Sequence, residues 1–139
     1  MKKILVLTML LFTVLFLQAQ NGSWTIRLNN KTILSSRQED PVKNIKKIKA
    51  GDWKKSGKLE ILFTEEEKNT WIRSFQFVDE QDNVILRKDS TTHAGISLTE
   101  LRKLFAGKKQ IKIYTTVSPL DPNIAIRMRR VHLCTLQLP

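Results

Sequence analysis

Cysteine is almost absent from this chain, which has only Cys134 among its 139 residues. A single thiol cannot form an internal disulfide, and it cannot supply the cysteine-rich ligand set of a structural zinc site. Histidine is nearly as rare, since only His93 and His132 are present. The sequence also lacks the G-x-S-x-G motif of many serine hydrolases. It therefore predicts no cofactor, no metal site and no catalytic set.

A hydrophobic run long enough to span a membrane is also missing. The apolar stretch from Ile4 to Leu17 has 14 residues and follows the basic pair Lys2-Lys3, whereas a transmembrane helix needs about 20. This arrangement is typical of a cleaved secretory signal, and its dilysine start is typical of bacteria. We expect residues 1–19 to be removed and residues 20–139 to form one small domain, periplasmic or extracellular.

Acidic residues are few, with 13 Asp and Glu against 24 Lys and Arg and a net charge of +11. Loss of Lys2 and Lys3 with the signal would lower this charge by two, to +9. A positive charge bears on partners and solubility rather than on fold. The partners it suggests outside the cytoplasm are an anionic glycan, the envelope surface or another protein, bound by a monomer or weak oligomer.

Alternation of apolar and polar residues is the main structural pattern. It is typical of half-buried β-strands and occurs at 24–28, 32–34, 59–63, 70–78, 84–88 and 111–117. Residues 79–83 suit the turn of a β-hairpin, residues 35–44 and 118–123 suit loops, and residues 45–58 fit either a helical turn or an irregular edge strand. We predict a mostly all-β fold, a two-sheet antiparallel β-sandwich of about seven strands.

One short connecting α-helix is predicted over residues 97–106. Ser97 and Glu100 have the spacing of a capping box, in which each side chain bonds a free amide of the first turn. The apolar residues that follow fall on one stripe at helical spacing, namely Leu98, Leu101, Leu104 and Phe105. Gly107 suits a left-handed stop.

The last segment, residues 124–138, predicts one long strand or two. Its apolar residues lie at even positions up to Met128 and at odd positions from Val131. One extra residue in a strand reverses which face its side chains occupy. We therefore expect a β-bulge near Arg129-Arg130.

A cluster of basic residues is the candidate binding site. Seven lysines fall between Lys43 and Lys58 around a single tryptophan. Lysines around an aromatic ring can hold an anion while the ring stacks on a sugar or base. The candidate anion- or ligand-binding residues are Lys46, Lys47, Lys49, Trp53, Lys54, Lys55, Arg127 and Arg129. The alternative is a solvated edge strand, which lysines protect from pairing with other chains.

Two other constellations are weaker. His132 and Cys134 are two residues apart, so on a regular strand they would point to the same side and could pair on a metal or as nucleophile and base. Cys134 fits a small buried residue better. A hydrolytic set can be drawn from His93, Asp89, Asp121 and residues 65–67, but such sites are recognised by geometry.

These observations favour an exported, non-enzymatic domain that binds an anionic or carbohydrate ligand or a protein partner. One alternative is a small secreted hydrolase with loop-borne acidic and histidine residues. The other is a structural subunit of an envelope assembly, for which an exposed apolar patch would be the sign.

Overall fold

The computed structural model describes residues 22–65, 71–89, 91–125 and 128–139, so the predicted signal at residues 1–19 lies outside the described residues. Within these ranges the chain forms nine strands and two short helices. In chain order they are β1 (Gly22–Leu28), β2 (Lys31–Ser36), β3 (Ile45–Lys47), α2 (Ala50–Lys54), β4 (Lys58–Glu65), β5 (Trp71–Val78), β6 (Val84–Lys88), β7 (His93–Ser97), α3 (Leu98–Leu104), β8 (Gln110–Pro119) and β9 (Val131–Gln137).

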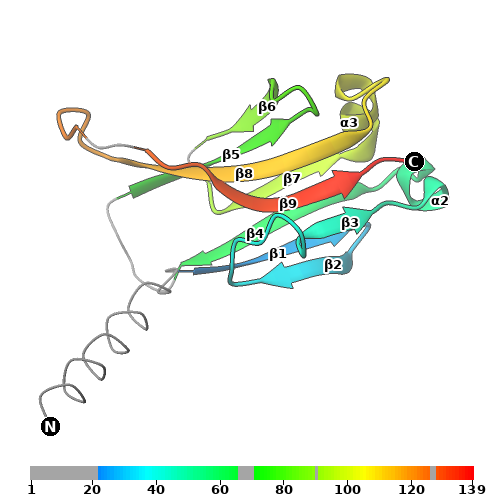
Figure 1. Cartoon of the computed structure of the whole chain (residues 1–139), viewed down its shortest axis with the longest axis horizontal. Helices are drawn as coiled ribbons and strands as arrows, with labels where there is room; N and C mark the ends of the chain where they lie inside the picture. The colour runs from blue at the N-terminus through cyan, green and yellow to red at the C-terminus, as the bar shows by residue number, and fades with distance from the viewer. Residues whose placement is uncertain (1–21, 66–70, 90, 126–127) are drawn as a thin grey trace, which may run out of the picture.

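The strands form two sheets, as Figure 1 shows. The four-stranded sheet has the order β2-β1-β4-β7, and the five-stranded sheet has the order β3-β9-β8-β5-β6. Every pairing is antiparallel except β3 with β9, which is parallel. The predicted all-β sandwich is confirmed, with two strands and one helical turn more than the alternation pattern indicated.

The inward side chains of the two sheets form one core. The alternating residues of β1 supply Trp24, Ile26 and Leu28, which are at most 6% exposed. Phe75 and Phe77 of β5 face them from the other sheet and are fully buried. Period-two burial of this kind follows from the pleat, which turns successive side chains to opposite faces.

Helix α3 covers one end of this core. The Ser97 hydroxyl accepts a hydrogen bond from the Glu100 amide at 3.1 Å, as the capping box predicts. Leu98 and Leu101 are fully buried and Phe105 is 2% exposed, whereas Leu104, which was predicted on the same stripe, is 36% exposed. The helix is shorter than the predicted 97–106 because Ser97 and Phe105 are its caps.

Two strands show no alternation in the sequence and are held by distant partners. The first lies in residues 45–58, where both predicted alternatives are present, the edge strand as β3 and the helical turn as α2. Residues 45–47 form the parallel edge strand β3 against β9, and the Asn44 carbonyl accepts from the Thr135 amide at 2.8 Å just before it. Strand β7 begins at His93, in a segment for which the sequence predicted no strand, and pairs with β4.

The C-terminal segment differs from its prediction in two ways. Strand β8 continues through Pro119, paired with Trp71, so the predicted loop at 118–123 begins later. Strand β9 begins only at Val131, and the pairing partners jump from Cys134 to His132, which leaves Leu133 as the extra residue. The predicted bulge near Arg129-Arg130 is therefore wrong in position, because the register shift lies inside β9.

No stretch of the described residues forms an apolar helix long enough to cross a bilayer. The two described helices have five and seven residues.

Candidate functional site: a lysine groove between two edge strands

A groove lies at one side of the sandwich, between the β1–β2 hairpin and the segment that runs from β3 into α2. The hairpin turn is Asn29-Asn30, and both residues have positive φ, 51° and 66°. Two-residue hairpins favour this conformation because its twist matches that of the flanking strands, and asparagine tolerates it. The turn brings Lys31 back beside Leu28 at the mouth of the groove.

The opposite wall is held by backbone pairing and one buried side chain. Ile48 follows β3 directly, is 3% exposed, and its amide donates to the Gln137 carbonyl at 2.9 Å. Asn29 ties the two walls together, since its side-chain amide donates to the Asp52 carbonyl at 3.1 Å. A short lysine-rich segment is therefore kept in place by its apolar anchor and by its neighbours, since α2 is only five residues long.

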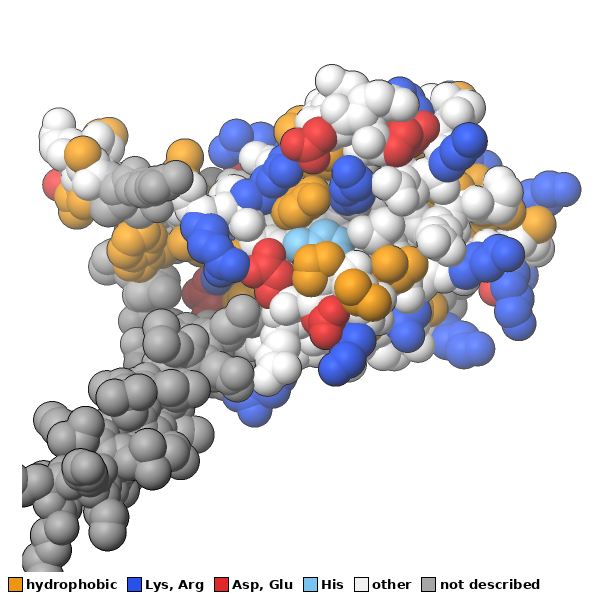
Figure 2. All heavy atoms as spheres, in the orientation of Figure 1, with side chains coloured by type: hydrophobic (Ala, Val, Ile, Leu, Met, Phe, Trp, Pro, Cys, Tyr) orange, Lys and Arg blue, Asp and Glu red, His pale blue; other side chains and the backbone are white. Residues whose placement is uncertain are grey.

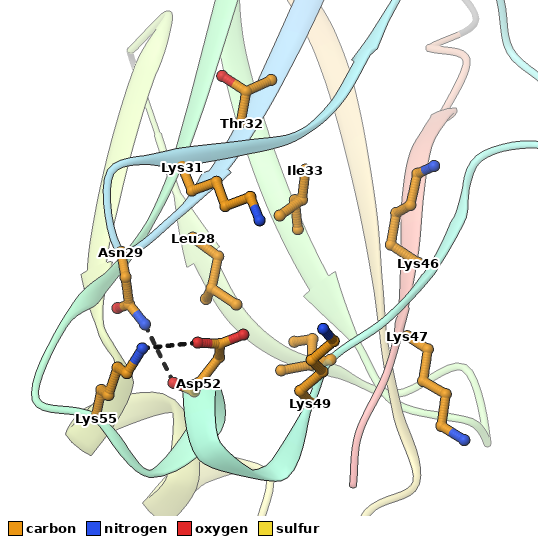
Figure 3. Close-up of a pocket in the computed structure, with 11 residues that line it drawn as sticks. Leu28, Asn29, Lys31, Thr32, Ile33, Lys46, Lys47, Lys49, Asp52 and Lys55 are labelled. Carbon is orange, nitrogen blue, oxygen red and sulfur yellow. Dashed lines mark hydrogen bonds and ion pairs between the residues drawn. The ribbon is translucent and has the colours of Figure 1, made fainter.

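We call this site the lysine groove and define it by the residues that line a space of about 430 Å³. They are Leu28, Asn29, Lys31, Thr32, Ile33, Lys46, Lys47, Ile48, Lys49, Asp52 and Lys55. Figure 3 shows Leu28 and Ile33 near the centre with lysines around them, while Lys47 points away from the other labelled side chains. The same end of the molecule carries many of the basic side chains visible in Figure 2.

The charge of the groove is strongly unbalanced. Asp52 is the only carboxylate among the residues that line it, and it forms an ion pair with Lys55 at 2.9 Å. This hydrogen bond is the main reason why the pKa of Asp52 is lowered, and the charges of Lys49 and Lys31 add to the effect. Within the described part of the chain, Lys31, Lys46, Lys47 and Lys49 form no ion pair with a carboxylate.

Four of the eight candidate residues named from the sequence come together here: Lys46, Lys47, Lys49 and Lys55. Sequence reasoning missed Lys31 and Asn29, which arrive from the hairpin. Their turn is visible in the sequence as an Asn-Asn pair, but nothing local indicates that it faces β3. The groove therefore depends on a contact between segments that are distant along the chain.

The other four candidates lie elsewhere. Trp53 and Lys54 do not line the groove; Trp53 is half-buried against the core, and its carbonyl accepts from Arg102. Arg129 lies just before β9 and forms an ion pair with Glu39. The groove lies at the opposite, C-terminal end of β9. Arg127 lies outside the described residues. The expected stacking platform of Trp53 amid lysines is therefore not part of this groove.

Some basic residues outside the groove form ion pairs with carboxylates of the chain. Lys108 binds Asp79 at 2.7 Å, and the same buried carboxylate accepts from the Gln81 and Asn83 amides. Arg130 pairs with Asp82 at 3.0 Å. The carboxylates of Asp79 and Asp82 thus organise the turn between β5 and β6 and bind cations of the chain itself.

His132 and Cys134 lie on opposite faces of the sheet, so the prediction that they share a side is wrong. Cys134 pairs with Ile113, which faces the core, and His132 pairs with Tyr114, which faces outward. The extra residue of the bulge causes this reversal. Burial raises the pKa of the Cys134 thiol to about 12, so it stays protonated at neutral pH. No group of three or more metal-ligating side chains gathers among the described residues.

The residues of the hydrolase alternative each have a different partner. His93 lies 3.4 Å from Glu60, Asp89 pairs with Arg87, and Asp121 accepts from the Asn123 amide. Glu65 binds Arg73 at 2.8 Å, while residues 66 and 67 lie outside the described residues. The described members of this set are not hydrogen-bonded to one another.

Exposed apolar residues, the sign of an assembly subunit, occur on the connection between β8 and β9. Leu120, Ile124 and Met128 are 51–61% exposed, and Figure 1 shows this connection projecting beyond the sheets. They lie far from the lysine groove along β9.

Comparison with known proteins gives no match to a family model, to a curated protein or to a solved structure.

Proposed function

We propose that the chain is exported and that its folded part is a non-enzymatic domain binding an anionic ligand in the lysine groove. The observation that supports the binding proposal is that Lys31, Lys46 and Lys49 line one hollow and, within the described residues, form no ion pair with a carboxylate. The pattern of residues 1–19 supports export.

An anion would relieve a repulsion that the fold maintains. Like charges held close together raise the local potential, and walls of low dielectric constant strengthen that field. Each lysine is a compact cation with three hydrogen-bond donors, which suits phosphate, sulfate and carboxylate groups. The ligand class favoured here is anionic rather than neutral carbohydrate, because no aromatic side chain lines the groove.

The test is binding of inorganic polyphosphate to residues 20–139 over a series of salt concentrations. The groove variant carries K31Q, K46Q and K49Q together. The matched control carries K54Q, K103Q and K109Q, which removes the same charge from exposed lysines that do not line the groove. Because bound lysines release counterions, the groove variant should reduce the slope of log affinity against log salt by about two to three.

The control variant should keep a slope close to that of the unchanged domain. Equal loss of affinity in the two variants would contradict the proposal, because it would show that overall charge and not the groove holds the polyanion. Circular dichroism of both variants confirms that the sheets are retained.

A further inference from the structure

The floor of the lysine groove is apolar, which a purely ionic site does not need. Leu28 and Ile48 belong to the buried core, and Ile33 packs against it. All three line the groove together with the lysines. The floor is the margin of the sandwich interior, where β2 ends one sheet and β3 ends the other. Leu28 and Ile48 are only 6% and 3% exposed, so half-buried Ile33 is the most accessible of the three.

The two edge strands explain why this margin of the interior opens to the surface. Strand β3 has three residues and pairs only with β9, while β2 pairs only with β1. Among the described strands, neither has a further neighbour to cover the space between the sheets. Figure 3 shows Ile33 and Leu28 in this space, with the ammonium group of Lys31 beside Ile33.

The space of about 430 Å³ lies within the range of small-molecule sites, which are mostly apolar with a few placed polar groups. A bare inorganic anion would engage the lysines and leave the half-buried side chain of Ile33 in contact with water. A neutral apolar molecule would cover the floor and leave the lysines without a counter-charge. A ligand with one anionic group joined to a short apolar chain satisfies both.

We infer that the ligand of the lysine groove is a single small anionic amphiphile, with its charged group among Lys31, Lys46 and Lys49 and its apolar chain on Leu28, Ile33 and Ile48. This inference rests on the proposed function and specifies its ligand class. An anionic phosphate or carboxylate head provides the same chemistry, and the chain length provides the additional affinity.

The experiment measures binding to residues 20–139 by titration calorimetry. The probes are inorganic phosphate, alkyl phosphates of increasing length below their micelle concentrations, and alkyl glucosides of matched length. Affinity for the alkyl phosphates should rise about two- to fourfold for each added methylene that reaches the floor. The glucosides should bind more weakly than the phosphates of equal length.

Two variants test the apolar floor and the surrounding lysines separately. I33T should reduce the dependence on chain length and retain phosphate binding, because threonine is a good strand former but introduces a hydroxyl. I85T is the matched control, since Ile85 is also half-buried on an edge strand, β6, of the other sheet. K31Q with K49Q should remove the preference for phosphate over glucoside.

Three results would overturn the inference. If polyphosphate binds in the groove but added methylenes do not raise affinity, the proposed function stands and the amphiphile does not. If the I33T variant folds and its affinity depends on chain length as strongly as that of the unchanged domain, Ile33 does not contact the apolar chain and the inference is wrong. If the domain binds anionic lipid vesicles but no single alkyl phosphate, the lysines serve a membrane surface instead. Absence of binding to every anionic probe would remove both proposals.

Discussion

A hydrogen bond between the two sheets gives a sharp test of the fold. The indole Nε1 of Trp24, in β1, donates to the Leu133 carbonyl in β9 at 3.1 Å, in the buried interior. Leu133 is the extra residue of the bulge. The substitution Trp24→Phe removes the donor and keeps an aromatic ring that can still stack on Phe63.

The expected loss of stability has two parts. A buried carbonyl left without its donor costs about 1–3 kcal/mol. The smaller ring buries less apolar surface, which adds roughly 1 kcal/mol. The free energy of unfolding should therefore fall by about 2–4 kcal/mol, which is a large share of the 5–15 kcal/mol typical of a domain.

Urea unfolding of residues 20–139, followed by far-ultraviolet circular dichroism, measures this loss. The control is Trp71→Phe, because Trp71 also lies on a strand but is 38% exposed, and it should cost less than about 1 kcal/mol. A loss below about 1 kcal/mol for Trp24→Phe, with an unchanged spectrum and denaturant slope, would refute the reasoning that this bond joins the sheets.

Two further predictions concern single side chains. Burial lowers the pKa of His132 despite the nearby Glu39 carboxylate, so the neutral ring is favoured in the folded state. The free energy of unfolding should therefore fall as the pH drops below about 6.5, which is the pKa of histidine in the unfolded chain. Thermal unfolding at pH 7.5 and 5.5 should show a smaller decrease for His132→Gln, and an equal decrease would count against the histidine. Ser97→Ala should cost about 1 kcal/mol of unfolding free energy by removing the cap of α3, whereas Thr99→Ala, inside the helix, should cost less.

Local sequence patterns were sufficient to predict the elements whose stabilising contacts lie between residues that are close along the chain. The alternation at Trp24–Leu28 and the cap that Ser97 gives to α3 are both present in the structure, because the pleat and the helix end impose them on neighbouring residues. The hairpin of β5 and β6 is present with its predicted five-residue connection. In these elements a residue and its partners are close along the chain.

Long-range pairing accounts for what the patterns missed. Strand β3 has too few residues for a periodicity and exists because β9 pairs with it. The bulge that separates His132 from Cys134 becomes visible only in the register against β8. A one-residue shift is ambiguous in a single strand, since it changes the faces of the side chains without changing composition.

The lysine groove combines both kinds of information. Composition was enough to single out the basic segment, since Lys46, Lys47 and Lys49 are nearly adjacent, and charge density is a property of the chain. Three features depend on the tertiary structure: Lys31 lines the groove, Trp53 does not, and Arg129 pairs with Glu39. The physical reason is that a binding site requires side chains to face a common space, and the packing of two sheets sets those directions.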